Sequence, residues 1–161
     1  MPSIESKLVT SRNSEDSSGI HLWLVLMKAH AALLEHAHRS IQAADLGDSD
    51  FFVLEVLLHK GPLPVNAIGQ KVRLTSGSIS VAIDRLVKRG FVERSEHPQD
   101  RRVRVVQLTP EGRMLIQDAF REHAAAMENA ASGLSEPERL ALVRLLKKLG
   151  KTAETHVHVS E

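Results

Sequence analysis

The sequence contains no cysteine and no tyrosine, and only 3% of its residues are aromatic. Without cysteine the chain cannot form disulfides, cysteine-ligated zinc sites or thiol-based redox sensors. Long hydrophobic runs are also missing, because the longest early one, residues 22–27, is closed by Lys28. Such a run is too short for a membrane span or for the core of a signal peptide. We therefore expect a cytoplasmic protein that makes no use of a membrane.

The net charge of +1 conceals an uneven distribution along the chain. Residues 60–110 include ten Lys or Arg and four Asp or Glu, a balance of +6, whereas the remainder has a balance of −5. A basic middle segment between acidic ends predicts a surface that faces a polyanion. The length of 161 residues, with 42% hydrophobic and 25% charged residues, is typical of an ordinary globular protein with its own core.

Hydrophobic periodicity and capping signals predict six helices and one β-hairpin. The first helix covers residues 20–44, where Gly and Pro are absent, and the polar residues 1–18 before it are expected to form a disordered arm. Three helices follow: one over 51–59 capped by Asp48, one over 64–72, and one from the cap Thr75 to Gly90. A hairpin with strands 91–95 and 102–108 comes next. The last two helices are one capped by Thr109 with Pro110 at its first position, and one opened by the capping box Ser135–Glu138 that frays from about Thr152.

The order of these elements predicts a mainly α fold with a small β-hairpin wing. The helices over 64–72 and 75–90 are joined by a tight link and followed by the hairpin, which is the arrangement of a winged helix-turn-helix. We assign this DNA-binding lobe to residues 46–109 and a helical dimerisation region to 20–45 and 110–152, with a flexible tail at 153–161. The long terminal helices carry more apolar surface than a small lobe can cover, which predicts a two-fold homodimer.

Three arginines, Arg101, Arg102 and Arg104, lie together at the predicted hairpin tip. They repel one another in the free protein, whereas DNA phosphates neutralise that repulsion and a narrow minor groove attracts arginine. Asp100 can orient one guanidinium in a two-pronged ion pair. A solvated turn is the alternative, with ion pairs worth about 0–1 kcal/mol each. The basic segment around the tip favours the interpretation as a DNA contact.

The helix over 75–90 is the candidate for the major groove. Its predicted outer face is rich in serine, and Ser hydroxyls and Arg85 can contact phosphates or bases. Serines can also simply make a helix face soluble, but those near Gly77 are poor helix formers, so helix propensity does not explain them. The predicted DNA-binding residues are Lys71, Arg73, Thr75, Ser76, Ser78, Ser80, Arg85, Asp100, Arg101, Arg102 and Arg104.

Residues 46–54, 63–70 and 78–94, followed by Asp100-Arg-Arg and Leu108-Thr-Pro-Glu-Gly, resemble the MarR family of bacterial transcription regulators. The resemblance covers about residues 20–150. It implies a winged helix-turn-helix homodimer, in most cases a repressor, that binds a pseudo-palindromic stretch of double-stranded DNA. It also implies that Arg102 touches DNA and that Asp100 orients it. Many members are released by small aromatic or phenolic ligands bound between the dimer helices and the DNA-binding lobe.

The start of the predicted major-groove helix, residues 75–79, most resembles family members that respond to quinones or hydroquinones. Three differences from the family pattern limit which DNA contacts and which ligands we expect. Val81 stands where many members have a polar or basic residue, peroxide sensing has no cysteine to use, and Phe52 replaces the aspartate of the urate-responsive branch. Trp23, His30, Phe52 and Glu55 are the candidate ligand contacts, although Trp23 suits interface packing and Glu55 the solvent face of its helix.

Two alternatives remain beside the ligand-responsive regulator. Histidines of the first helix, among them His30, His36 and His38, allow a zinc-responsive regulator of the same fold. Because such a site needs three or four converging ligands, we predict neither a metal nor a cofactor. The other alternative is a dimeric scaffold that binds a protein partner and no DNA. The sequence has no phosphate-binding loop and no nucleophile motif, so we do not expect an enzyme.

Overall fold

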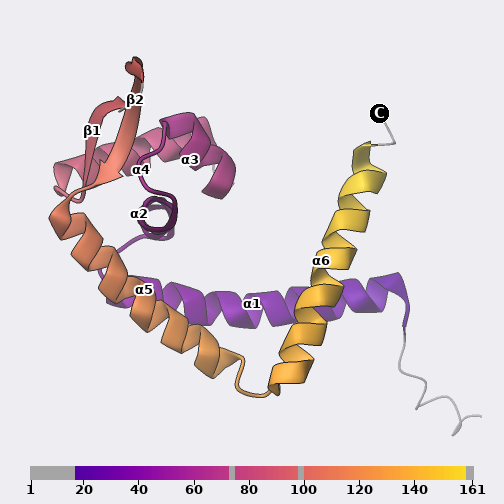
Figure 1. Cartoon of the computed structure of the whole chain (residues 1–161). Helices are drawn as coiled ribbons and strands as arrows, with labels where there is room; N and C mark the ends of the chain where they lie inside the picture. Colours follow the sequence, from indigo (N-terminus) through magenta and orange to yellow (C-terminus); the bar gives the residue numbers. More distant parts are fainter. Residues whose placement is uncertain (1–16, 73–74, 98–99, 159–161) are drawn as a thin grey trace, which may run out of the picture. The chain divides into compact units, whose positions relative to one another are not determined.

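The computed structural model describes residues 17–72, 75–97 and 100–158 (Figure 1). The described part contains two compact units, which divide between Glu35 and His36. Residues 1–16 of the predicted arm lie outside the described part. Within that part, no helix is both long and apolar enough to cross a membrane. The described elements are α1 (Gly19–Ala43), α2 (Asp48–Lys60), α3 (Val65–Val72), α4 (Ser76–Lys88), β1 (Val92–His97), β2 (Asp100–Leu108), α5 (Pro110–Ala130) and α6 (Glu136–His158).

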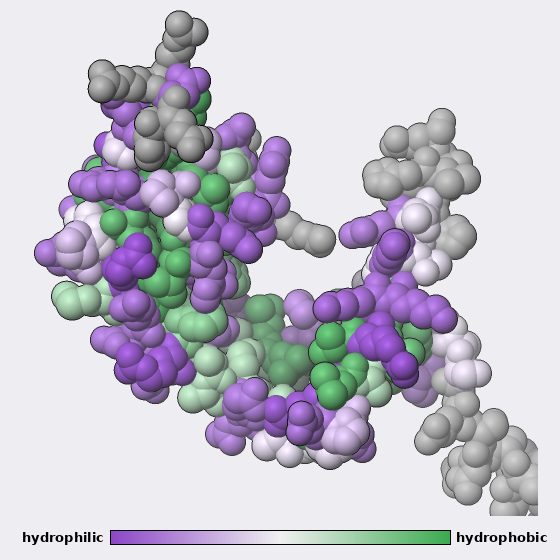
Figure 2. Space-filling view, in the orientation of Figure 1, coloured by the Kyte–Doolittle hydropathy of each residue, from purple (hydrophilic) through white to green (hydrophobic). Residues whose placement is uncertain are grey.

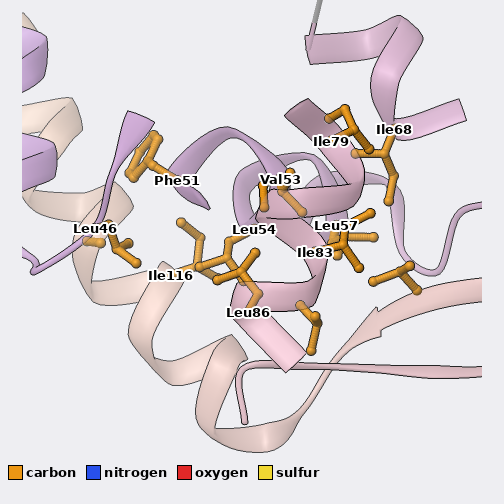
Figure 3. Packing of buried hydrophobic residues seen from close by; sticks show 14 of the residues in the cluster. Leu46, Phe51, Val53, Leu54, Leu57, Ile68, Ile79, Ile83, Leu86 and Ile116 are labelled. Atoms are coloured by element: carbon orange, nitrogen blue, oxygen red, sulfur yellow. The ribbon is translucent and has the colours of Figure 1, made fainter. Parts of the chain in front are cut away.

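The core of the second unit is built around α2, which contacts α3, α4, α5 and β2. Figure 3 shows hydrophobic side chains of these helices converging, with Leu54 of α2, Leu86 of α4 and Ile116 of α5 close to one another. All three are fully buried. Burial of a side chain of this size contributes about 1.5–3 kcal/mol, so this shared core fixes α4 against α2 and α5.

Helix α4 begins and ends where its capping residues predict. The Thr75 hydroxyl accepts a hydrogen bond from the backbone N–H of Ser78. At the other end Gly90 has a φ of 76°, the left-handed conformation that glycine adopts without strain. Ile79, Ala82, Ile83 and Leu86 are buried, so one stripe of the helix packs inward as its periodicity indicates.

The hairpin is longer than predicted, since β1 reaches His97 and β2 starts at Asp100. Its antiparallel register pairs Val92 with Leu108 and Glu96 with Arg104, and an irregularity follows Glu96. Leu63 forms an additional bridge with Val106 through two backbone hydrogen bonds of 3.1 and 2.8 Å. The base of the wing is thereby attached to the segment before α3.

A tight joint connects β2 to α5. Thr109 caps α5 by accepting from the backbone N–H of Gly112, and its own hydroxyl donates to the carbonyl oxygen of Gly90. A Cβ atom on Gly112 would overlap the carbonyl group of Phe91. The Leu-Thr-Pro-Glu-Gly motif is thus explained by packing: a larger residue at its last position would push α5 away from the end of α4.

Two local predictions are wrong. Asp48 does not cap α2, because Gly47 occupies the cap position without a side-chain bond and Asp48 instead pairs with His38 at 2.7 Å. Helix α6 does not fray at Thr152 but continues to His158. At its start, the Glu138 carboxylate accepts from the backbone N–H of Ser135 at 2.8 Å, and hydrogen bonds from Ser135 lower the pKa of Glu138.

Candidate nucleic-acid interface

The solvent face of α4 lies opposite its buried stripe. The positions Gly77, Val81, Asp84 and Lys88 are all exposed, and their spacing of four, three and four residues puts them on one line along the helix. Ser78 and Ser80 are exposed as well but stand to the sides of this line. The surface that α4 offers to a groove therefore consists of small, apolar and oppositely charged side chains.

Two of the hydroxyls predicted to contact DNA, those of Thr75 and Ser78, already have a role within the protein. Thr75 Oγ1 lies 2.9 Å from Ser78 Oγ, so both take part in capping α4. Lys71 is exposed in the last turn of α3. Arg73 and the side chain of Ser76 lie outside the described residues. The hydroxyls of Thr75 and Ser78 can still meet a phosphate, since both of these residues are exposed at the start of α4.

Arg85 forms a two-pronged ion pair with Asp50, which sequence reasoning missed. Its Nε lies 2.9 Å from Asp50 Oδ2, and its Nη2 lies 2.5 Å from Asp50 Oδ1. Asp50 is only 2% exposed, and its hydrogen bond raises the pKa of Arg85. The signal was present in the sequence, because Asp50, Val53, Leu54 and Leu57 follow the spacing of a buried helical stripe. The arginine predicted to face DNA is thus held against α2.

A second arginine extends this contact toward the end of α1. Arg89 Nη2 lies 3.0 Å from Asp45 Oδ2, and Arg89 Nη1 lies 4.0 Å from Asp50 Oδ2. The guanidinium also stacks over the ring of Phe91 at 4.9 Å. Together Arg85 and Arg89 tie the C-terminal half of α4 to the first turn of α2 and to Asp45 in the turn before it.

The wing is tied to α4 by a different ion pair. Arg94 Nη2 on β1 lies 2.6 Å from Asp84 Oδ1 on α4. Near the tip, Arg104 and Glu96 approach to 3.9 Å across the strands, and both are largely exposed. The side chains of Arg101 and Arg102 lie outside the described residues, and Asp100 is exposed. The roles predicted for these tip residues therefore stay predictions.

The candidate ligand contacts fall into separate surroundings. Trp23 and His30 belong to the first unit, where both are exposed. In the second unit Phe52 packs edge-on against Phe51, with ring centroids 5.9 Å apart, and Glu55 lies 3.6 Å from His59 Nε2. Among the described residues no group of three or more His, Asp or Glu side chains is placed to hold a metal ion.

His123 of α5 is half-buried and contacts residues of α1 and α2. Its Nδ1 lies 2.8 Å from Ser40 Oγ, and its ring centroid lies 4.9 Å from that of Phe51. The Ser40 hydroxyl donates its proton to the carbonyl of Ala37, so Nδ1 of His123 acts as the donor to Ser40. Burial lowers the pKa of His123, opposed by the charge of Glu55.

A cavity of about 430 Å³ opens between the end of α1 and α5. Alanines make up four of its eight lining residues, and Asp118 and Glu122 are its charged residues. Phe52 and Glu55 do not line it. The lining residues are Ser40, Ala43, Ala44, Leu115, Asp118, Ala119, Glu122 and Ala126.

Comparison with known proteins places this architecture in a family. The MarR family model matches residues 46–103, which span α2 to the wing. The HTH-type transcriptional regulator MhqR of Bacillus subtilis is 37% identical over 135 residues, which cover 84% of this chain and 93% of that protein. The chain belongs to the MarR family. The prediction from the wing and helix motifs is thereby confirmed, as is the mainly α winged-helix fold.

Two further relatives extend the comparison of this MarR-family protein. The HTH-type transcriptional repressor MdtR of Bacillus subtilis is 27% identical over 136 residues, 84% of this chain and 85% of the repressor. A structure of Bordetella bronchiseptica BpsR, described as showing the regulation of its DNA binding by 6-hydroxynicotinic acid, has a TM-score of 0.69 and 26% identity, and covers 85% of this chain and 96% of its own. This MarR-family protein is a DNA-binding transcriptional regulator, and its family consists of regulators rather than enzymes.

Proposed function

We propose that the protein is a homodimeric repressor that binds a two-fold operator and releases it when a small aromatic molecule binds. The observation that carries the DNA-binding part is the exposed face of α4 beside the wing, both within residues 60–110, which have a charge balance of +6. A groove of double-stranded DNA is the polyanion into which an exposed helix fits. The name of the relative MdtR supports the choice of repressor.

The terminal helices support a homodimer. Helix α6 exposes a stripe of leucines at positions 142, 145, 146 and 149, with Leu145 56% exposed. The N-terminal part of α1 likewise exposes large apolar side chains, including Ile20 at 64% and Trp23 at 55%. Figure 2 shows hydrophobic surface on the terminal helices. Because apolar faces of this extent mark interaction sites, we assign them to the interface with a second copy.

The dimer sets the spacing of the two recognition helices. A two-fold operator requires its half-sites to lie about one helical turn, roughly 34–36 Å, apart. A ligand weakens binding when it binds better to a dimer whose helices do not match this spacing. The ion pairs of Arg85 and Arg89 support such coupling, since the first joins α4 to α2 and the second joins α4 to the turn after α1.

The cavity between α1 and α5 supports a small, uncharged aromatic ligand. Its volume falls within the usual range for ligand pockets, about 300–1,000 Å³, and its alanine methyl groups suit an aromatic ring. Asp118 and Glu122 disfavour a carboxylate at this site. We therefore propose a neutral phenol or hydroquinone, in contrast to the aromatic acid named for BpsR.

The DNA-binding proposal is tested by selecting duplexes from a random library with the full chain. We expect a two-fold sequence to be enriched, and we expect Arg102→Ala to weaken binding to it and to lower the salt slope by about 1 per wing. Arg121→Ala is the matched control, because Arg121 lies on α5 and pairs with Asp118. Enrichment of no sequence refutes the function, and equal effects of the two variants refute the role of the wing.

The ligand proposal is tested on the same complex by fluorescence anisotropy. Hydroquinone should release the labelled operator at lower concentration than benzoate does. Ala126→Leu fills the cavity from a half-buried position outside the core and should abolish release by hydroquinone while leaving operator affinity in its absence unchanged. Release that survives this substitution places the ligand elsewhere, and preferential release by benzoate contradicts the choice of a neutral ligand.

A further inference from the structure

The most exposed large hydrophobic side chain of the described DNA-binding lobe is on the outer line of α4. Val81 is 60% exposed, compared with 38% for Phe52 and 36% for Val87. It stands between Gly77 and Asp84 on the line that faces away from the core. A β-branched residue has a lower helix propensity than alanine and gains little from burial here, so the fold does not account for it.

The charged side chains beside Val81 are already paired within the protein. Arg85 is bound to Asp50 of α2, and Asp84 is bound to Arg94 of β1. Long donors such as arginine usually read guanine, but this arginine is directed toward the protein. At the centre of the outer line, α4 therefore presents the two methyl groups of Val81.

The major groove contains one apolar group that a methyl surface can recognise. Thymine carries a C5-methyl group there, and apolar side chains contact it in direct readout. We infer that Val81 packs against a thymine methyl group in each half-site and selects thymine at that position. This inference rests on the proposed binding of α4 in the major groove and adds a base preference to it.

Gly77 supplies a second observation that points the same way. It lies one turn before Val81, has no φ that requires glycine, and a Cβ atom there would meet nothing within 4 Å. Glycine costs about 0.5–1 kcal/mol relative to alanine in a helix, so neither packing nor helix stability explains it. A bare backbone at this position lets α4 approach the base edges closely enough for Val81 to reach them.

The test uses the operator obtained by selection and replaces each thymine in turn by deoxyuridine, which removes only the methyl group. We expect one thymine per half-site to be sensitive, with a loss of affinity of about fourfold in one half-site and roughly 15-fold in both, as for burial of one methyl group. Val81→Ala should bind the unmodified operator more weakly and lose sensitivity to that deoxyuridine. Val81 is exposed, so this variant should fold normally, and its thermal unfolding is the check.

Each outcome separates the inference from the function on which it rests. Sequence-specific binding that tolerates deoxyuridine everywhere overturns the inference and leaves the regulator intact. A sensitive thymine whose effect persists in Val81→Ala assigns the methyl contact to another residue and also overturns it. Selection of no operator overturns both, and the unmodified duplex reveals that case before any base is changed.

Discussion

The carboxylate of Asp50 on α2 accepts hydrogen bonds from Nε and Nη2 of Arg85 on α4, 35 positions later in the sequence. The two partners differ in exposure, since the side chain of Asp50 is 3% exposed and that of Arg85 44%. The carboxylate is thus shielded from solvent, whereas the guanidinium is partly exposed at the surface. Hydrogen bonds to a charged partner are about twice as strong as neutral ones, so this pair fixes the orientation of α4.

Removing the guanidinium of Arg85 should destabilise the protein more than removing that of an exposed ion pair. Arg85→Ala leaves a buried charge without a partner, for which we expect a loss of about 2–3 kcal/mol in the free energy of unfolding. Urea denaturation measures it, and the double variant Asp50→Asn, Arg85→Ala should recover part of the loss. Arg94→Ala is the matched control, because its pair with Asp84 is exposed on both sides and should be worth less than about 1 kcal/mol. Equal losses of stability in Arg85→Ala and Arg94→Ala would contradict the structural role of the Asp50–Arg85 pair.

Gly112→Ala should destabilise the protein strongly. The added methyl group would overlap the Phe91 carbonyl at the joint between the end of α4 and α5, and backbone atoms cannot yield as a flexible side chain can. We expect a loss of about 3 kcal/mol or more, measured by urea denaturation. Gly150→Ala in α6 meets nothing within 4 Å and should instead stabilise by about 0.5–1 kcal/mol. A tolerated Gly112→Ala would show that α5 can shift at this joint.

The contrast between predicted and missed features follows from the range of the interactions involved. Thr75, Thr109 and Gly90 were assigned correctly because a cap is made within a few residues of its own helix. The prediction for Asp48 is wrong because its partner, His38, lies on the preceding helix. A local sequence pattern contains no information about such a distant partner.

The candidate site shows the same division. Its proposed location on α4 and the wing follows from periodicity and local charge, which depend on the order of residues in the sequence. Arg85 is exposed on α4 as predicted. The direction of its guanidinium, however, is set by Asp50, a residue of another helix. The sequence shows that Val81 departs from the family pattern. That Val81 is the main group at the centre of the outer line becomes clear from the structure, where the neighbouring Asp84 and Arg85 are paired within the protein.

The stability of the protein should fall as the pH drops below about 7, and His123 should account for part of this loss. Burial lowers its pKa in the folded state, so the unfolded state, with a pKa near 6.5, takes up the proton first. The contribution of neutral His123 is therefore complete above about pH 6.5 and is lost as the pH falls through the lowered folded value.

Urea denaturation between pH 5 and 8 measures this dependence. His123→Gln should flatten the curve over that range, because an amide at this position can still bond to Ser40 but does not titrate. His30→Gln is the matched control, since His30 is exposed and belongs to the other unit, and it should retain the wild-type dependence. An unchanged slope in His123→Gln would assign the titration to another group.

Gly77→Ala should separate the stability of α4 from its function. The substitution meets no neighbour within 4 Å, and it replaces the weakest ordinary helix former by the best, so the free energy of unfolding should rise by about 0.5–1 kcal/mol. Affinity for the selected operator should nevertheless fall, because the added methyl group holds the helix backbone away from the base edges. Gly133→Ala, with equally open surroundings outside the lobe, should leave the affinity unchanged. A Gly77→Ala protein that is more stable and binds as tightly as the wild type would show that this turn of α4 does not enter the groove.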